Sequence, residues 1–441
     1  MTVGNPTKLI LRFIVPLLLG NIFQQLYSMV DAIIVGQYVG SDALAGIGST
    51  GAIIFFIVGF ATGLTNGFAV PMAQSYGAQD MKRLKKFVAM SCYLCVFFAI
   101  LLTTLSVLFI EPLLDLMQTP AEIHDYAYNY IIVILVGLFA TITYNMNAST
   151  LRAVGDSRTP LLFLVIASIL NIFLDIVFIV NFDMGVAGAG YATVISQGVA
   201  SILCIIYMQK KFEILRLSKQ DFKVNFDIIK NLVTIGVPMA FQFTIIATGS
   251  IILQSVINTL GTSAVAAYTI CSKIEQLAIQ PFVTLGIVST TYTAQNIGAG
   301  KFDRVRDGMK RMFIIGVIIS VGGGILIHSF NDQLINAFLA EEERLVEVIT
   351  FAKQYLAWSC GFFFPLMCLI LFRGAIQGMG DVKFPTVAGI IELLGRVLTA
   401  TGLVHTLGFT AVCIACPTAW SGASMLVITV FLGKLKKLNI S

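Results

Sequence analysis

The sequence predicts an all-α integral membrane protein with twelve transmembrane helices arranged in two six-helix lobes. Three observations lead to this fold class: an apolar composition, a regular series of long hydrophobic segments, and an internal repeat. Of the 441 residues, 57% are hydrophobic and only 12% are charged, and the mean hydropathy is +0.89. Soluble domains carry about 25% charged residues. We therefore expect the bilayer to be the solvent for most of the chain.

The hydrophobic segments are long enough to cross about 30 Å of hydrocarbon, which takes roughly 20 helical residues. Several are longer and contain proline, so tilted or kinked helices are expected. The predicted spans are residues 13–38, 44–76, 87–110, 122–150, 160–182, 186–208, 228–259, 264–295, 311–330, 346–375, 384–405 and 409–433.

Most of the 28 lysines and arginines fall in one alternating set of connecting segments, such as 82–86 and 301–311. Loops rich in basic residues stay in the cytoplasm. The alternation therefore predicts a multi-pass protein of the inner (plasma) membrane with both termini cytoplasmic. We expect no cleavable signal peptide, because the first residues lead directly into a full-length span. The net charge of +5 resides in these loops and does not predict binding to nucleic acid.

Three short motifs occur in the same order in both halves of the chain. The pairs are GSDALA (40–45) and GTSAVA (261–266), AQSYGA (73–78) and AQNIGA (294–299), and GDSRTP (155–160) and GDVKFP (380–385). Each half holds six spans, so both halves enter the membrane from the same side. A pseudo-two-fold axis along the membrane normal should relate them.

The predicted domains are an N-terminal lobe (1–209), a cytoplasmic linker (210–227) and a C-terminal lobe (228–441). The linker is the most polar internal segment. Its apolar side chains, among them Leu215 and Phe222, are expected to be free to lie on the membrane surface.

These features resemble the multidrug and toxic compound extrusion (MATE) family. The similarity includes proline in spans one and seven (Pro16 and Pro238), AQxxGA after spans two and eight, and GDxxxP after spans four and ten. The resemblance implies export of cationic drugs or other small toxic compounds by alternating access, in exchange for Na⁺ or H⁺. It implies small-molecule substrates, contact with membrane lipid, no cofactor apart from the coupling ion, and no enzymatic activity. We expect a monomer.

Acidic residues inside membrane spans are costly, so each is a functional candidate. Asp31, Asp175 and Thr193 are predicted to lie at one depth, about 10 Å below the outer ends of their helices. Asn171 lies one turn deeper than Asp175. Two carboxylates, an amide and a hydroxyl make an oxygen-rich site that suits a hard cation such as Na⁺.

If no cation is bound there, the two carboxylates repel each other and one should take up a proton. The alternative is that each polar group packs alone in the core of its lobe. The MATE resemblance implies that Asp31, Asn171, Asp175 and Thr193 form the cation-coupling site. Candidate neighbours of the cation or the substrate are Tyr27, Tyr130 and Asn145.

In the C-terminal lobe, Glu275 is a candidate contact for a cationic substrate, although it could instead neutralise a basic group such as Lys273. The seventh span has no acid and carries Gln242 and Gln254, which argues against a second cation site. Glu392 and Arg396 lie four residues apart on one helix, and we expect a structural ion pair between them.

Two other functions fit the sequence less well. A flippase for lipid-linked saccharides of the same superfamily would need a basic cavity for pyrophosphate, whereas the basic residues lie mostly in loops. An enzyme or an ATP-driven pump would need a catalytic or nucleotide motif, and neither HExxH, GxSxG nor a P-loop is present.

Overall fold

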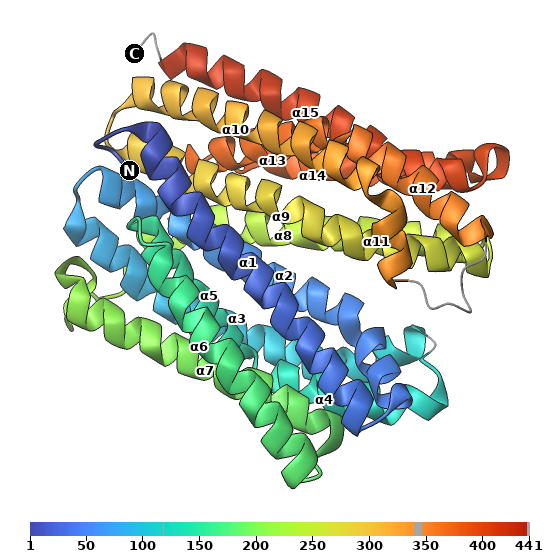
Figure 1. Cartoon of the computed structure of the whole chain (residues 1–441). Helices are drawn as coiled ribbons and strands as arrows, with labels where there is room; N and C mark the ends of the chain where they lie inside the picture. The colour runs from blue at the N-terminus through green and yellow to red at the C-terminus, as the bar shows by residue number, and fades with distance from the viewer. Residues whose placement is uncertain (118, 339–345, 439–441) are drawn as a thin grey trace. The chain divides into compact units, whose positions relative to one another are not determined.

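The structure, a computed structural model, describes residues 1–117, 119–338 and 346–438, and within these it contains helices and no β-strand (Figure 1). The first half holds α1 (Pro6–Tyr38), α2 (Ser41–Gly77), α3 (Met81–Leu116), α4 (Ala121–Val136), α5 (Leu138–Ala153), α6 (Arg158–Asp175), the π-helix η1 (Ile176–Asn181) and α7 (Gly185–Lys211). The 3₁₀ turn η2 (Glu213–Leu215) follows. The second half holds α8 (Phe226–Asn258), α9 (Thr262–Gly298), α10 (Phe302–Ser329), α11 (Asn331–Phe338), α12 (Val346–Gly361), α13 (Phe363–Gly378), α14 (Lys383–Leu407) and α15 (Phe409–Leu438).

The helices match the predicted spans and confirm the all-α membrane fold class. Among the described residues, nine helices are long and apolar enough to cross a membrane, and two bent pairs raise the number to eleven. The remaining long helix is α9, which corresponds to the predicted eighth span and carries Lys273 and Glu275 within it. The short helix α11 was not predicted; it is strongly amphipathic and too short to span.

The two bent pairs fall within the predicted spans 122–150 and 346–375. The axes of α4 and α5 meet at 50° and those of α12 and α13 at 47°. At the first bend, a Cβ atom on Gly137 would lie 2.2 Å from Val194, so only glycine allows α7 to approach this closely. At the second bend, Pro365 has no N–H to donate to the carbonyl of Gly361, which breaks the helix there.

The repeated GDxxxP motif forms the same helix start in both halves. Gly155 and Gly380 have φ angles of 96° and 85°, a conformation that glycine adopts without strain. The side chains of Asp156 and Asp381 then accept hydrogen bonds from backbone N–H groups of the helix that follows. The motif is therefore a capping structure that begins α6 and α14.

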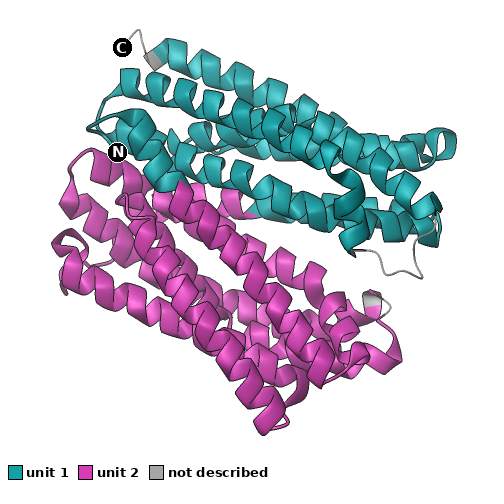
Figure 2. Ribbon diagram, in the orientation of Figure 1, with its two compact units in different colours: residues 1–14, 241–441 teal, residues 15–240 magenta. Residues whose placement is uncertain are grey.

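The chain divides into two compact units (Figure 2). Unit 1 contains residues 1–14 and 241–441, and unit 2 contains residues 15–240. Helices α1 and α8 each have residues in both units, whereas the predicted lobe boundaries placed each of these helices in a single lobe. The predicted lobes themselves stay a prediction.

Small residues bring helices close together within each unit. In unit 2, a Cβ atom on Gly67 of α2 would lie 2.5 Å from the Cα atom of Gly236 in α8. In unit 1, a Cβ atom on Gly308 of α10 would lie 2.1 Å from the ring of Tyr292 in α9. Membrane helices pack through such contacts because lipid supplies no hydrophobic drive between them.

The segment between α7 and α8 is more firmly packed than predicted. Leu215 is buried, and Phe222 packs edge-to-face on Tyr93 of α3 while its carbonyl accepts a hydrogen bond from the Tyr93 hydroxyl. The expectation that these two side chains are free for the membrane surface was therefore wrong. The backbone N–H and the hydroxyl of Ser218 donate to Asp221, and these hydrogen bonds lower the pKa of its carboxyl.

Candidate functional site

Unit 2 brings two buried acids together. Asp31 lies on α1 and Asp175 is the last residue of α6, and their carboxyl groups are within hydrogen-bonding reach of each other. Asp175 is fully buried. Both oxygens of Asp175 and Oδ1 of Asp31 lack a hydrogen-bond donor among the described residues. We refer to Asp31 and Asp175 as the carboxyl pair.

No ion pair with a lysine, arginine or histidine in the described part of the chain neutralises the carboxyl pair. Two ionised carboxylates this close to hydrogen-bonding contact would repel each other strongly in a medium of low dielectric constant. A proton on one of the carboxyls, or a cation close to both, would remove this repulsion.

The backbone around Asp175 is irregular. The α-helix α6 ends at this residue and continues as the π-helix η1, in which the N–H of Phe182 donates to the carbonyl of Val177. Single π-helical turns occur often at functional sites, because the extra residue per turn redirects a side chain. The sequence does not predict this feature, since no residue type marks a π-turn.

The other two predicted ligands lie next to the carboxyl pair. Asn171 is buried one turn before Asp175, and its Nδ2 donates to Oγ1 of Thr193 on α7 at 3.5 Å. This bond is at the limit of hydrogen-bonding distance. Oδ1 of Asn171 has no donor among the described residues. The structure thus brings all four predicted coupling residues into one cluster.

The predicted tyrosine neighbours are also present. Tyr27, one turn before Asp31, lies within electrostatic reach of both acids, and so does Tyr130 on α4. Tyr130 also packs against an apolar cluster that includes Val35 and Ile179. The carboxyl pair therefore sits between phenol rings and aliphatic side chains, with little access to bulk solvent.

A cavity of about 120 Å³ adjoins the cluster within unit 2. We call it the inner cavity. It is lined by Tyr27, Asn171 and Thr193 from the cluster and by the predicted neighbour Asn145. Two further lining residues, Ser196 and Gln197 on α7, were missed. Their positions three and four residues after Thr193 place them on the same helix face, a spacing that could have revealed them.

Glu275 belongs to unit 1 and is not part of this cluster. Its carboxylate accepts hydrogen bonds from the hydroxyls of Tyr355, at 3.1 Å, and Ser359, both on α12. The basic group within its electrostatic reach is Arg396, and no ion pair forms with Lys273. Glu275 is half-buried, so part of it faces the surroundings of unit 1.

The predicted ion pair between Glu392 and Arg396 was wrong. Glu392 pairs with Arg373 of α13, and both side chains are buried. Arg396 instead donates to the carbonyl of Ile246 and to the hydroxyl of Ser250, both on α8. Spacing along one helix could not reveal a stronger partner on another.

The glutamines of the predicted seventh span also have partners within unit 1. Nε2 of Gln242 donates to the carbonyl of Pro385 at 3.1 Å, and its Oε1 accepts from Gln377 at 2.9 Å. Gln254 donates to Asn258 one turn later at 2.9 Å. These amides are therefore engaged in helix packing.

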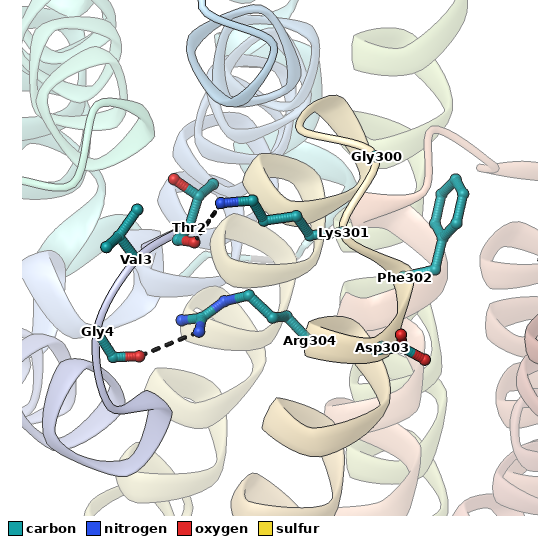
Figure 3. A pocket seen from close by; sticks show the side chains of 8 residues that line it. All are labelled: Thr2, Val3, Gly4, Gly300, Lys301, Phe302, Asp303 and Arg304. Carbon is teal, nitrogen blue, oxygen red and sulfur yellow. Dashed lines mark hydrogen bonds between the residues drawn. The ribbon is translucent and has the colours of Figure 1, made fainter.

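A wider cavity of about 750 Å³ lies at the start of the chain in unit 1 (Figure 3). Lys301 donates to the carbonyl of Thr2 at 2.9 Å, and Arg304 donates to the carbonyl of Gly4 at 3.0 Å. These bonds fasten the segment before α1 to the connection between α9 and α10. Backbone carbonyls of the first residues thus satisfy Lys301 and Arg304, and the cavity contains none of the predicted site residues.

Within the residues that the structure describes, no three His, Cys, Asp or Glu side chains gather to hold a metal ion. The carboxyl pair has instead the oxygen chemistry of a site for a mobile hard cation. Two units of membrane helices, one of them with uncompensated acids in its interior, define an integral membrane transport protein.

Comparison with known proteins agrees with this class. The MatE family model matches residues 16–177 and 238–401. The probable multidrug resistance protein YoeA of Bacillus subtilis is 29% identical over 443 residues, which cover 97% of this chain and 94% of that protein. The probable multidrug resistance protein NorM of Thermotoga maritima is 25% identical, with 88% and 83% covered.

Solved structures show the same similarity. A crystal structure of MATE in complex with MaL6 superimposes with a TM-score of 0.92 at 25% identity, over 99% of this chain and 98% of that one. An outward-facing multidrug resistance MATE transporter of the MOP superfamily gives 0.91 at the same identity and coverage. The chain belongs to the MatE family. The relatives named here are two probable multidrug resistance proteins and a multidrug resistance MATE family transporter.

Proposed function

We propose that the chain is a secondary active antiporter that exports cationic drugs or other small toxic compounds in exchange for Na⁺ or H⁺. The carboxyl pair carries the proposal, because it holds two acids from different helices with no fixed cation beside them. Its relatives are named for multidrug resistance, which fits an efflux role.

The coupling ion would bind between helices α1, α6 and α7. A Na⁺ ion would take oxygens from Asp31, Asp175, Asn171 and Thr193, whereas a proton would be shared by the carboxyl pair. Either occupant removes the repulsion between the acids and lets the three helices approach. Loss of the ion would let them separate, and this gives the site two states that an ion gradient can bias.

Coupling requires that the bound ion lowers the affinity for the drug and that the bound drug lowers the affinity for the ion. If the bound ion disfavours the drug-binding state, then the drug must disfavour the ion by the same factor. A substrate that enters from the cytoplasm would release the ion inward, and a new ion from outside would release the substrate outward. Glu275, as a half-buried acid in unit 1, is a candidate contact for the cationic group of the substrate.

A lipid-linked saccharide flippase is less well supported. Such a protein needs basic groups to hold a pyrophosphate, but the cluster in unit 2 offers carboxyls, an amide and hydroxyls. The arginines inside unit 1 are engaged by Glu392 and by α8.

The proposal places the protein in the plasma membrane with both termini in the cytoplasm, since basic side chains concentrate in one set of loops. The test is efflux of a cationic dye from proteoliposomes with Na⁺ and pH gradients imposed one at a time. We expect efflux to respond to at least one gradient. Efflux that ignores both gradients would contradict the antiport proposal.

A further inference from the structure

The segment between α7 and α8 carries two large apolar side chains that unit 2 leaves uncovered. Val224 is 57% exposed, and Phe226, the first residue of α8, is 80% exposed. Transfer of apolar surface out of water is favourable, so a pair this exposed favours an apolar environment outside the unit.

The backbone that presents these two side chains is held in place. Phe222 packs edge-to-face on Tyr93 of α3, and its carbonyl accepts a hydrogen bond from the Tyr93 hydroxyl at 3.1 Å. The side chain of Asn225 accepts a hydrogen bond at 3.1 Å from a backbone N–H in the first turn of α8. Val224 and Phe226 are therefore exposed on an ordered support, and they could not turn inward without breaking these contacts.

Lysines lie on both sides of the apolar pair. Lys219 and Lys223 precede Val224, and Lys230 lies one turn after Phe226 on the same face of α8. All three lysines are exposed, and none forms an ion pair or a side-chain hydrogen bond within the described chain. Residues 210–230 include six basic and three acidic side chains. The apolar pair therefore lies in a surface with an excess of positive charge.

The nearby acids do not neutralise these lysines. The carboxyl of Asp221 accepts two hydrogen bonds from Ser218 and lies within electrostatic reach of Lys85 and Lys86 on α3. Asp227 is in the first turn of α8, where the helix dipole favours an acid. Helix α3 thus adds further positive charge beside the segment.

The position of Phe226 indicates what covers this surface. Helix α8 is long and apolar enough to cross a membrane, and Phe226 is its first residue. Aromatic side chains at the end of such a span lie at the level of the lipid headgroups. Basic side chains at that level attract anionic lipids. A lipid therefore fits both the apolar pair and the charge, whereas a soluble protein would have to displace lipid to reach Phe226.

We propose that Lys219, Lys223, Val224, Phe226 and Lys230, here called the linker surface, bind an anionic phospholipid of the phosphatidylglycerol type. Val224 and Phe226 contact the apolar part of the lipid, and the three ammonium groups hold the headgroup phosphate. The inference goes beyond the proposed antiport and does not rest on it, because the linker surface lies outside the cluster of acids.

The first test removes charge and keeps the apolar pair. The full-length protein in neutral detergent is titrated with phosphatidylglycerol, and thermal unfolding gives the lipid concentration at half-maximal stabilisation. In Lys219→Gln/Lys223→Gln this concentration should rise by about tenfold, since two attractive charges are lost. Lys219→Arg/Lys223→Arg keeps both charges and should match wild type. A glutamine variant with the wild-type lipid dependence would overturn the site.

Lys82→Gln/Arg306→Gln is the matched control. Both side chains are exposed at the starts of α3 and α10, and neither has an exposed large apolar residue next to it in the sequence. This variant loses the same charge, but its half-stabilising concentration of phosphatidylglycerol should change by less than about threefold. A shift equal to that of Lys219→Gln/Lys223→Gln would mean that the lipid responds only to total charge, and it would overturn the linker surface as a site.

The second test removes the apolar contact. Phe226→Ser should raise the half-stabilising concentrations of phosphatidylglycerol and phosphatidylcholine alike, by about tenfold, because burial of the ring does not depend on the headgroup. Phe226→Leu should keep most of the binding. Phe226 is largely exposed, so its replacement should leave the unfolding temperature without lipid unchanged; if that temperature falls, Val224→Ser carries the same test. An unchanged lipid dependence in the serine variant would overturn the site.

A soluble anion distinguishes a lipid from free phosphate. Glycerol 1-phosphate carries a phosphate but no acyl chain, and it should not stabilise the protein at concentrations at which phosphatidylglycerol does. If it does stabilise the protein, and the effect is lost in Lys219→Gln/Lys223→Gln, the lysines serve a soluble phosphate ligand and the lipid site is wrong. None of these measurements involves efflux, so they stand or fall separately from the proposed antiport.

Discussion

The two units of this protein share sequence motifs and helix starts, but they differ in whether their buried acidic side chains have a basic partner. In unit 2, Asp31 and Asp175 face each other with no basic side chain paired to them. In unit 1, Glu392 forms a buried ion pair with Arg373, and Glu275 lies within reach of Arg396 and accepts two hydroxyl hydrogen bonds.

This difference shows what distinguishes an ion site from a structural network in the same architecture. A fixed arginine neutralises its acid permanently, so no mobile cation is needed. An acid pair without such a partner depends on an occupant from solution, and its structure then responds to the ion concentration. The proposed coupling role of unit 2 therefore rests on the charge balance around its acids more than on the helix arrangement.

The strongest test of this contrast is Asp175→Asn. The substitution keeps the shape of the side chain but removes the charge that requires an ion, so gradient-driven efflux should fall to background while the protein stays folded. Efflux is measured in proteoliposomes and normalised to folded protein. Asp183→Asn is the control, because Asp183 is an exposed acid just beyond η1 and should be neutral. If the Asp175→Asn variant shows wild-type efflux, the unpaired acids of unit 2 do not differ in role from the paired acids of unit 1.

In unit 1, removing one partner of the ion pair should damage stability rather than coupling. Arg373→Gln leaves Glu392 buried without its cation, which costs about 3–5 kcal/mol in comparable cases. Thermal unfolding in detergent gives the measurement. The double variant Arg373→Gln/Glu392→Gln should recover most of the loss, and its efflux per folded protein should resemble wild type. A double variant that is stable but does not pump would show that this pair takes part in transport.

Glu275→Gln should have a smaller and selective effect. If this acid contacts a cationic substrate, its export should weaken by about tenfold, or about 1.4 kcal/mol, since one charge interaction is lost. Neutral and zwitterionic substrates should be exported as before. Comparing dyes of different charge in one preparation checks this, and a uniform loss would indicate that the bonds to Tyr355 and Ser359 serve folding.

The smallest expected effect is that of Thr193→Ala. It removes one neutral oxygen among several, so the ion concentration for half-maximal efflux should rise by about threefold to tenfold with little change in maximal rate. Thr193→Ser keeps the hydroxyl and should restore wild-type behaviour. An effect as large as that of Asp175→Asn would mean that the hydroxyl matters as much as the acids.

Much of the site could be anticipated because intramembrane acids are rare and helix geometry fixes their depth. Counting residues from the ends of three spans placed Asp31, Asp175 and Thr193 at one level, and the structure brings them together with Asn171. The π-turn after Asp175 could not be anticipated, because it is decided by packing.

Partners across helices were harder to anticipate. Arg396 was the nearest base to Glu392 along the chain, but Arg373 on another helix occupies the better position. Leu215 and Phe222 were judged by composition alone, yet Leu215 is buried and Phe222 packs on Tyr93 of α3. In each case the sequence showed the chemical group but not the neighbour.

The sequence by itself determined the membrane fold, the order of the membrane-spanning segments, the repeat and the identity of the buried acids. It could do so because the bilayer imposes a fixed span length and makes every charge inside it conspicuous. Only the tertiary structure decided which acids meet each other and which meet arginine. It also placed Ser196 and Gln197 along a cavity, because contacts between helices depend on rotation and close approach that no periodicity along one chain encodes.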